Sequence, residues 1–139
     1  MTMRKMALDV GTVRIGIATS DPMGIIASGY ETYTRTDDTE NDMKYIADLA
    51  KEKQCDTFVV GLPLNMDGTE GPKVAEIREF AEKLSDYSDL KIVFQDERWS
   101  TVSAEKMLIQ SSVRRDKRKK VIDKVAATII LQTYLDRIH

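Results

Sequence analysis

Residues 6–21 constrain the fold of this chain more than any other stretch. Two short apolar runs, at 6–10 and 15–18, flank a polar break that begins at Gly11. Short, β-branched runs around such a break predict two antiparallel strands joined by a tight turn. Asp9 stands at the end of the first run, where an apolar residue is expected. It is either a turn-forming residue or a functional carboxylate, and this stretch alone leaves both interpretations open.

The rest of the chain alternates between predicted strands and helices. We expect strands at residues 3–10, 14–20, 25–34, 56–62 and 90–95, and helices at residues 42–53, 72–85, 102–109 and 121–137. Three successive strands predict an antiparallel meander, and the helical crossovers that follow allow parallel pairing. The predicted fold class is therefore α/β, with a mixed five-stranded sheet flanked by helices. The length of 139 residues predicts one domain spanning the whole chain.

Composition excludes several classes of protein. The chain is 42% apolar and 32% charged, and it has neither a membrane-length apolar run nor a signal-peptide core, so we expect a cytoplasmic protein with no membrane partner. Cys55 is the single cysteine, which rules out an internal disulfide. His139 is the single histidine and ends the chain, so a histidine-dependent triad is not expected. Acid–base or metal chemistry would have to use carboxylates.

Positive charge is concentrated in residues 114–124. Although the whole chain has a net charge of −2, this stretch holds seven basic and two acidic residues. A basic segment on an acidic body indicates local attraction to an anion, such as a nucleic-acid backbone. The alternative interpretation is a solvated, mobile surface loop. The candidate nucleic-acid-binding residues are Arg14, Arg98, Arg114, Arg115, Lys117, Arg118, Lys119 and Lys120.

Three carboxylates are candidates for chemistry. Asp123 has apolar residues at the third, fourth and seventh positions after it, which places it beside the buried face of the last predicted helix. A carboxylate there is costly unless it is paired or metal-bound, although an aspartate in a first helical turn is also favoured by the helix dipole. Glu97 closes a strand, where a loop carboxylate paired with Arg98 is the alternative. Asp96 is an equal candidate from its position.

Taken together, Asp9, Glu97 and Asp123 suit a metal site. Two stand at strand ends, and the third stands on a helix that can cover the same edge of the sheet. Carboxylate oxygens are the ligands that Mg²⁺ or Mn²⁺ prefers, and one or two such ions can promote phosphodiester hydrolysis. The glycine-rich loop at residues 61–71 lacks the lysine of a P-loop. It is either a structured connector or a border of the site. The candidate near-site residues are Gly11, Thr12, Gly16, Asn65 and Asp67.

Four stretches carry a family resemblance. They read Leu-Asp-Val-Gly-Thr-Val-Arg-Ile-Gly at 8–16, Val-Gly-Leu-Pro-Leu-Asn-Met-Asp-Gly-Thr-Glu-Gly at 60–71, Asp-Glu-Arg-Trp-Ser-Thr at 96–101 and Lys-Lys-Val-Ile-Asp-Lys-Val-Ala-Ala at 119–127. In this order they resemble the YqgF (RuvX) family of Holliday-junction-resolvase-like proteins, which are also described as pre-16S rRNA nucleases. The resemblance implies an RNase H-like fold and an acidic metal-binding triad at Asp9, Glu97 and Asp123. It favours Glu97 over Asp96.

The resemblance and the residues lead to one main functional prediction and several alternatives. We predict a Mg²⁺-dependent nuclease that acts on structured RNA, namely the 5′ end of pre-16S rRNA in ribosome biogenesis. The alternatives are a DNA endonuclease acting on four-way junctions and a non-catalytic nucleic-acid-binding factor in transcription or ribosome assembly. A phosphate-binding fragment related to sugar kinases fits less well, because those enzymes clamp ATP between two lobes. With no dedicated dimer helix, we expect a monomer or a weak homodimer.

Overall fold

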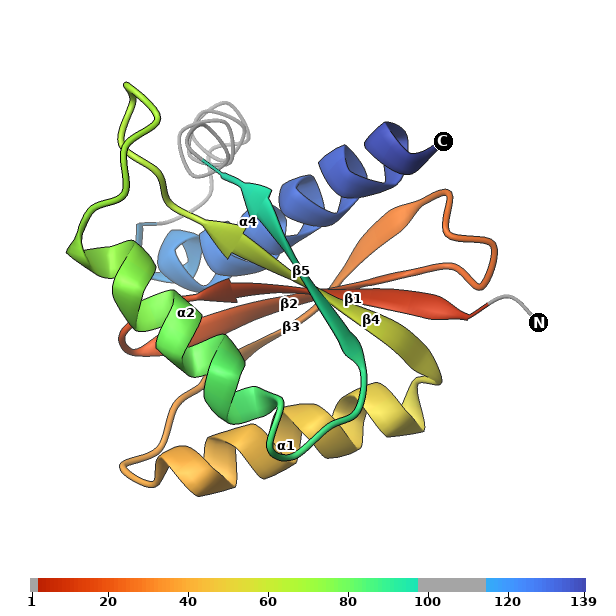
Figure 1. Ribbon diagram of the computed structural model, residues 1–139, viewed down its shortest axis with the longest axis horizontal. Coiled ribbons are helices and arrows are strands. Elements are labelled where there is room, and N and C mark those ends of the chain that lie inside the picture. Colours follow the sequence, from red (N-terminus) through yellow and green to blue (C-terminus); the bar gives the residue numbers. More distant parts are fainter. Residues whose placement is uncertain (1–2, 98–114) are drawn as a thin grey trace.

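The computed structural model describes residues 3–97 and 115–139, except for the side chains of 115–120. Five strands form one mixed sheet in the order β3-β2-β1-β4-β5 (Figure 1). They are β1 (Arg4–Val10), β2 (Arg14–Ser20), β3 (Ala27–Thr34), β4 (Cys55–Leu62) and β5 (Lys91–Asp96). The first three strands pair antiparallel, and β4 and β5 run parallel to β1. The predicted meander with later parallel strands is confirmed.

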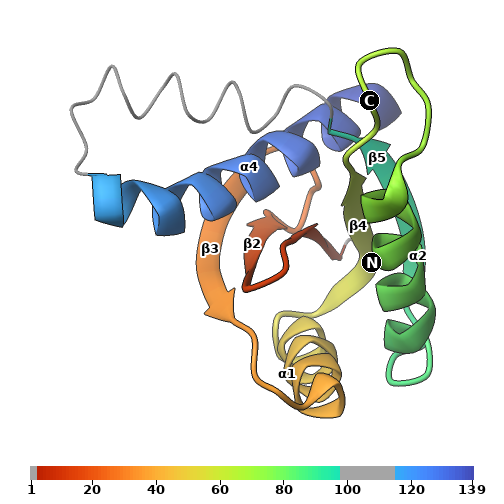
Figure 2. The ribbon, with the colours of Figure 1, turned by 90° about the vertical axis from the view of Figure 1, so that its left-hand side faces the viewer.

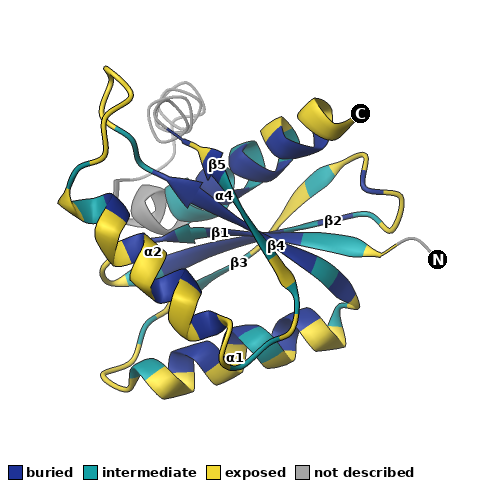
Figure 3. Ribbon diagram, viewed as in Figure 1, coloured by how far each residue is buried: buried dark blue, intermediate teal, exposed yellow. Residues whose placement is uncertain are grey.

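Helices cover both faces of the sheet. The helices α1 (Thr39–Glu52) and α2 (Pro72–Leu84) lie on one face, and α4 (Arg115–Ile138) crosses the other (Figure 2). Figure 3 shows the buried side of α1 and α2 turned towards the sheet and their exposed side turned outwards. No helix in residues 3–97 or 115–139 combines the length and hydropathy needed to cross a bilayer.

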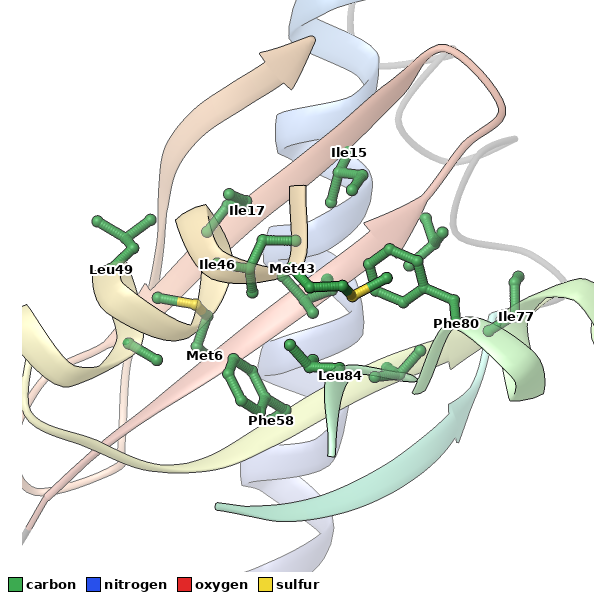
Figure 4. Packing of buried hydrophobic residues seen from close by; sticks show 14 of the residues in the cluster. Met6, Ile15, Ile17, Met43, Ile46, Leu49, Phe58, Ile77, Phe80 and Leu84 are labelled. Atoms are coloured by element: carbon green, nitrogen blue, oxygen red, sulfur yellow. The ribbon is translucent and has the colours of Figure 1, made fainter. Parts of the chain in front are cut away.

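The two faces differ in the size of their side chains. Towards α1 and α2 the sheet presents large residues, including Met6, Ile17 and Phe58, which pack against Ile46 and Phe80 (Figure 4). Towards α4 it presents small ones. The residues of this second face are Ala7, Gly16, Ala18, Val59 and Gly61. A helix can approach a surface of small residues closely, so α4 packs nearer to the sheet than a face of leucines would permit.

Several element boundaries differ from the predicted ones. α1 begins at Thr39 because the Asp38 carboxylate accepts hydrogen bonds from the next turn's backbone N–H groups, which extends the helix ahead of its apolar stripe. Cys55 lies inside β4 and is buried. α4 begins at Arg115, so much of the basic stretch expected as a loop is helical. Arginine and lysine have high helix propensity, which explains this extension. The helix predicted at 102–109 lies outside the described residues.

Candidate active site

Asp9 lies near the carboxyl end of β1, with its side chain on the face that α4 covers. Leu8 and Val10 point into the α1–α2 core, so alternation along the strand directs Asp9 to the opposite face. Its partner on β2 is Gly16. A Cβ atom on Gly16 would lie only 1.9 Å from the backbone carbonyl oxygen of Asp123. The absence of a side chain at this position therefore brings α4, and with it Asp123, beside Asp9.

Glu97 reaches the same face from the other side of β1. Its backbone N–H donates to the carbonyl oxygen of Leu62 at 3.0 Å, which continues the β4–β5 pairing by one residue. Its side chain lies over Gly61, where a Cβ atom would come within 2.8 Å of the carboxyl carbon. Glu97 is 8% exposed, whereas Asp96 is exposed. Strand alternation thus separates two residues that position along the chain left equivalent, and it is Glu97 that faces α4.

Asp9 and Glu97 form a side-chain hydrogen bond. A hydrogen bond between two carboxyl groups requires a proton on one of them. Burial raises the pKa of the Asp9 carboxyl from its ordinary 3.8 to about 6. The hydrogen bond from Glu97 and the positive charge of Lys73 act to lower this pKa, whereas the negative charge of Asp123 acts to raise it. At neutral pH the site therefore holds negative charge that burial disfavours and that a cation would offset.

Asp123 has a cationic partner of its own. The Nε atom of Arg14 donates to its carboxylate at 2.9 Å, and both side chains are only partly exposed. Arg14 stands at the start of β2, directly after the turn that follows Asp9. The guanidinium group is predicted to contact nucleic acid, and in the structure it pairs with one carboxylate of the predicted triad.

Lys73 stands at the rim of the site. It lies in the first turn of α2, and its Nζ atom donates to the Thr12 hydroxyl at 3.1 Å. Thr12, a predicted near-site residue, therefore lies in the turn between the acidic residues and α2. Sequence reasoning missed Lys73. The available signal was a lysine in the first turn of a helix, where acidic residues are the favoured ones.

The loop between β4 and α2 is held together by its own side chains. The Asn65 amide donates to the Thr69 hydroxyl at 2.9 Å, and the Thr69 backbone N–H donates to the Asp67 carboxylate at 3.0 Å. All three side chains are exposed. These contacts give Asn65 and Asp67 a part in shaping the loop, which accords with the connector interpretation.

The structure describes the predicted nucleic-acid-binding residues to different extents. Arg98 and Arg114 lie outside the described residues. Five others fall in the first turns of α4, where the structure describes the backbone only. They are Arg115, Lys117, Arg118, Lys119 and Lys120. Because the same helix carries Asp123, this basic segment leads directly towards the acidic residues.

The carboxylates of the site are compatible in type with a divalent metal ion. In the part of the chain that the structure describes, no group of three or more histidine, cysteine, aspartate or glutamate side chains is arranged to hold an ion. The predicted triad instead forms two pairs, Asp9 with Glu97 and Asp123 with Arg14. Mg²⁺ commonly uses one or two carboxylates together with water and substrate phosphates. The Asp9–Glu97 pair fits that requirement in its chemistry and its charge.

Comparison with known families identifies the chain. The family model described as "RuvX: Holliday junction resolvase" matches residues 3–137. The chain belongs to the RuvX family. It is 50% identical over 137 residues to a protein of Streptococcus thermophilus, covering 97% of this chain and 99% of the relative. It is also 52% identical over 136 residues to a protein of Halalkalibacterium halodurans, covering 97% of each. Both relatives are named "Putative pre-16S rRNA nuclease".

The RuvX chain also resembles a solved structure of different sequence. The structure is T. thermophilus RuvC in complex with a Holliday junction substrate, with a TM-score of 0.58 and 9% sequence identity, covering 98% of this chain and 96% of that one. At such low identity the likeness establishes the fold alone. The RNase H-like fold that the resemblance implied is confirmed.

Proposed function

We propose that this RuvX protein is a nuclease that hydrolyses phosphodiester bonds in structured RNA with the help of a divalent metal ion, and that its substrate is the 5′ end of pre-16S rRNA. The observation that carries the proposal is the hydrogen-bonded pair of half-buried Asp9 and buried Glu97, beside Asp123 at one end of the sheet. The names of its close relatives support the choice of substrate. We propose further that the whole chain is one nuclease domain, cytoplasmic, and a monomer or weak homodimer.

Asp9 and Glu97, with Asp123 beside them, would hold Mg²⁺ or Mn²⁺. A bound ion of this kind stabilises charge on phosphate oxygens and lowers the pKa of a neighbouring water. The proton shared in the Asp9–Glu97 hydrogen bond must leave before both carboxylates can bind the ion, because a protonated carboxyl is a poor ligand for a cation. Burial excludes bulk water from Glu97, which strengthens the electrostatic interactions made there.

Cations around the acidic residues would hold the nucleic-acid backbone. Arg14 and Lys73 flank the turn after Asp9, from β2 and α2 respectively. The basic first turns of α4 extend the positive charge away from the site. Contacts of this type position a phosphate backbone without reading its sequence. Selection of the substrate would then depend on its shape and on any unpaired nucleotides.

A cleavage panel with purified protein tests the proposal. Precursor 16S rRNA, a four-way DNA junction and a single strand are incubated in Mg²⁺ and, separately, in EDTA. Asp9→Asn and Asp123→Asn are compared with Asp48→Asn, which makes the same chemical change at an exposed position on α1. We expect Mg²⁺-dependent cleavage of the rRNA by the wild type and Asp48→Asn, and a loss of about 100-fold or more in Asp9→Asn. Full activity of Asp9→Asn would remove the mechanism.

A DNA-junction endonuclease is the second candidate. The description of the family model supports it. Preferential cutting of the four-way junction in the same panel would favour this function. Binding without metal and without cleavage of any substrate would favour the non-catalytic factor.

A further inference from the structure

A cavity of about 220 Å³ lies between α1 and α2, on the opposite face of the sheet from α4. Its floor is formed by four buried apolar side chains. They are Val10, Met43, Ile77 and Phe80. Figure 4 shows Met43 from α1 next to Phe80 from α2, with Ile77 beyond Phe80. An apolar floor with a few polar groups around it is typical of a small-molecule or nucleobase site.

The rim of this cavity is charged. Arg35, Lys73 and Lys83 supply cations, and Glu76 and Glu79 supply carboxylates. A charged rim over an apolar floor suits a ligand that has a flat apolar body, hydrogen-bond donors and an anionic group.

Arg35 is held in place before any ligand arrives. Its Nη1 atom donates to the carbonyl oxygen of Gly11 at 2.9 Å, and its guanidinium lies 5.4 Å from the centre of the Phe80 ring. Its Nε atom is 3.7 Å from the buried carboxylate of Asp42. A fixed guanidinium plane of this kind is a surface on which nucleic-acid bases stack.

The cavity adjoins the candidate active site. Thr12 and Lys73 line the cavity, and the hydrogen bond between them joins α2 to the turn that follows Asp9. The positive charge of Lys73 also acts on Asp9. Val10, on the cavity floor, is the next residue after Asp9 on β1 and points to the other face of the sheet. One nucleotide can thus reach the cavity while its neighbour lies over the acidic pair.

We propose that the cavity binds one unpaired nucleotide of the substrate, with its base over the apolar floor beside Arg35 and its phosphate at Lys73 and Thr12. The proposal rests on the function proposed above. Glu76 and Glu79 accept hydrogen bonds from base N–H groups, so guanine, with two donors on one edge, is favoured over uracil, with one. The site would let the enzyme select RNA by an unpaired residue next to the cut.

Nucleotide binding can be measured without metal and without catalysis. The ¹⁵N-labelled full chain is titrated with GMP and with UMP in EDTA, and backbone amide shifts are followed. We expect saturable shifts around Thr39, Met43 and Phe80, with GMP binding about fivefold or more tighter than UMP. Titrations with a hairpin RNA carrying one bulged guanosine and with its fully paired counterpart distinguish a nucleotide within the substrate from a free one. Shifts around the cavity with the bulged hairpin only, or more strongly with it, support the proposal.

Two tryptophan variants of α2 provide the matched comparison. Glu79→Trp places an indole at the cavity, and Glu82→Trp places one on the exposed side of the same helix. We expect Glu79→Trp to weaken GMP binding about tenfold or more, with Glu82→Trp unchanged. Equal effects of the two variants, or shifts confined to residues outside the cavity, would overturn the proposal. So would free GMP binding that the bulged hairpin does not reproduce.

The cleavage panel separates this proposal from the nuclease assignment. If the protein cleaves bulged and paired RNA equally and Glu79→Trp leaves both rates unchanged, the cavity has no part in substrate selection although the enzyme is a nuclease. If nothing is cleaved but GMP and the bulged hairpin shift the cavity residues, the nuclease assignment fails and the nucleotide site stands.

Discussion

At the scale of single residues, Asp9 carries its negative charge in an environment that disfavours it. Its pKa of about 6 records the cost of holding a carboxylate where burial and Asp123 both disfavour its charged form. Such a cost is common where a protein is built to bind or to react, and it is avoidable where only stability matters. This cost fits the role proposed for Asp9 as a functional carboxylate better than that of a turn former.

Metal-free protein should lose stability as the pH rises through the titration of Asp9. The pKa of Asp9 in the folded protein lies above the ordinary 3.8. The contribution of Asp9 to the free energy of unfolding is therefore most favourable below pH 4 and declines until the pH passes about 6. Asp9→Asn removes the charge and should raise the free energy of unfolding at pH 7.5 by about 1–3 kcal/mol. Urea denaturation in EDTA at several pH values measures this. Asp48→Asn is the control, and a less stable Asp9→Asn would contradict the explanation.

Gly16→Ala should damage both stability and activity. Its Cβ would meet the backbone of Asp123, which can move only if α4 moves, so we expect a loss of about 2–4 kcal/mol in the free energy of unfolding. Gly29→Ala is the matched control, because its Cβ would meet only side-chain atoms, those of Lys124 and Thr128, and no backbone. Thermal unfolding and rRNA cleavage are measured for both variants. Similar losses in the two would show that the approach of α4 at Gly16 is not special.

At the scale of elements, Arg35 connects three parts of the fold. Its backbone N–H donates to Val13, its side chain donates to Gly11, and it lies near Asp42 of α1. The β1–β2 turn, the end of β3 and the first turn of α1 are thereby joined. The same turn follows Asp9, so an interaction on the α1 side of the sheet supports a residue on the α4 side.

Arg35→Ala should cost about 2–3 kcal/mol of stability, because it leaves the buried Asp42 carboxylate with less compensation. Arg78→Ala is the matched control: Arg78 also lies over an aromatic ring, that of Phe94, but pairs with an exposed Glu70. We expect Arg78→Ala to lower the free energy of unfolding by at most about 1 kcal/mol. Chemical denaturation of both variants, with Asp42→Asn added to form a double-mutant cycle, measures the coupling. A cycle with no coupling energy would refute the role given to the Arg35–Asp42 contact.

At the scale of the whole molecule, both faces of the sheet converge on one end. The carboxylates lie under α4, the cavity lies between α1 and α2, and the turn after β1 separates them. Catalytic groups and a nucleotide site can therefore act on adjacent parts of one substrate. The parallel strands β4 and β5 deliver their carboxyl ends to this same place, as expected for open α/β sheets.

Mg²⁺ should stabilise the folded protein by mass action if the carboxylates bind it. We expect the Tm to rise with added Mg²⁺ at pH 7.5 and to rise less at pH 5, where Asp9 is largely protonated. Removal of the ion with EDTA should restore the lower Tm. Differential scanning calorimetry on the wild type and Asp9→Asn measures the effect. An equal shift in both proteins would place the ion elsewhere.

Local patterns were sufficient to predict most of the fold. Strand and helix types depend on periodicity within a few residues, so the order of the elements and the mixed sheet followed from the sequence. The helix starts at Thr39 and Arg115 were predicted wrongly. They depend on a capping side chain and on the helix propensity of basic residues, which are weaker signals in a sequence than an apolar stripe.

The sequence by itself predicted that acid–base or metal chemistry would use carboxylates, since it holds a single histidine and a single cysteine. Position along the strand could not choose between Asp96 and Glu97, and only the family resemblance favoured Glu97, because the choice depends on which face of the sheet each residue occupies in β5. Nor could the sequence pair Asp123 with Arg14 or bring Lys73 to Thr12. Those contacts join residues far apart in the chain, and only the close approach of α4 at Gly16 and the packing of α2 beside the β1–β2 turn decide them.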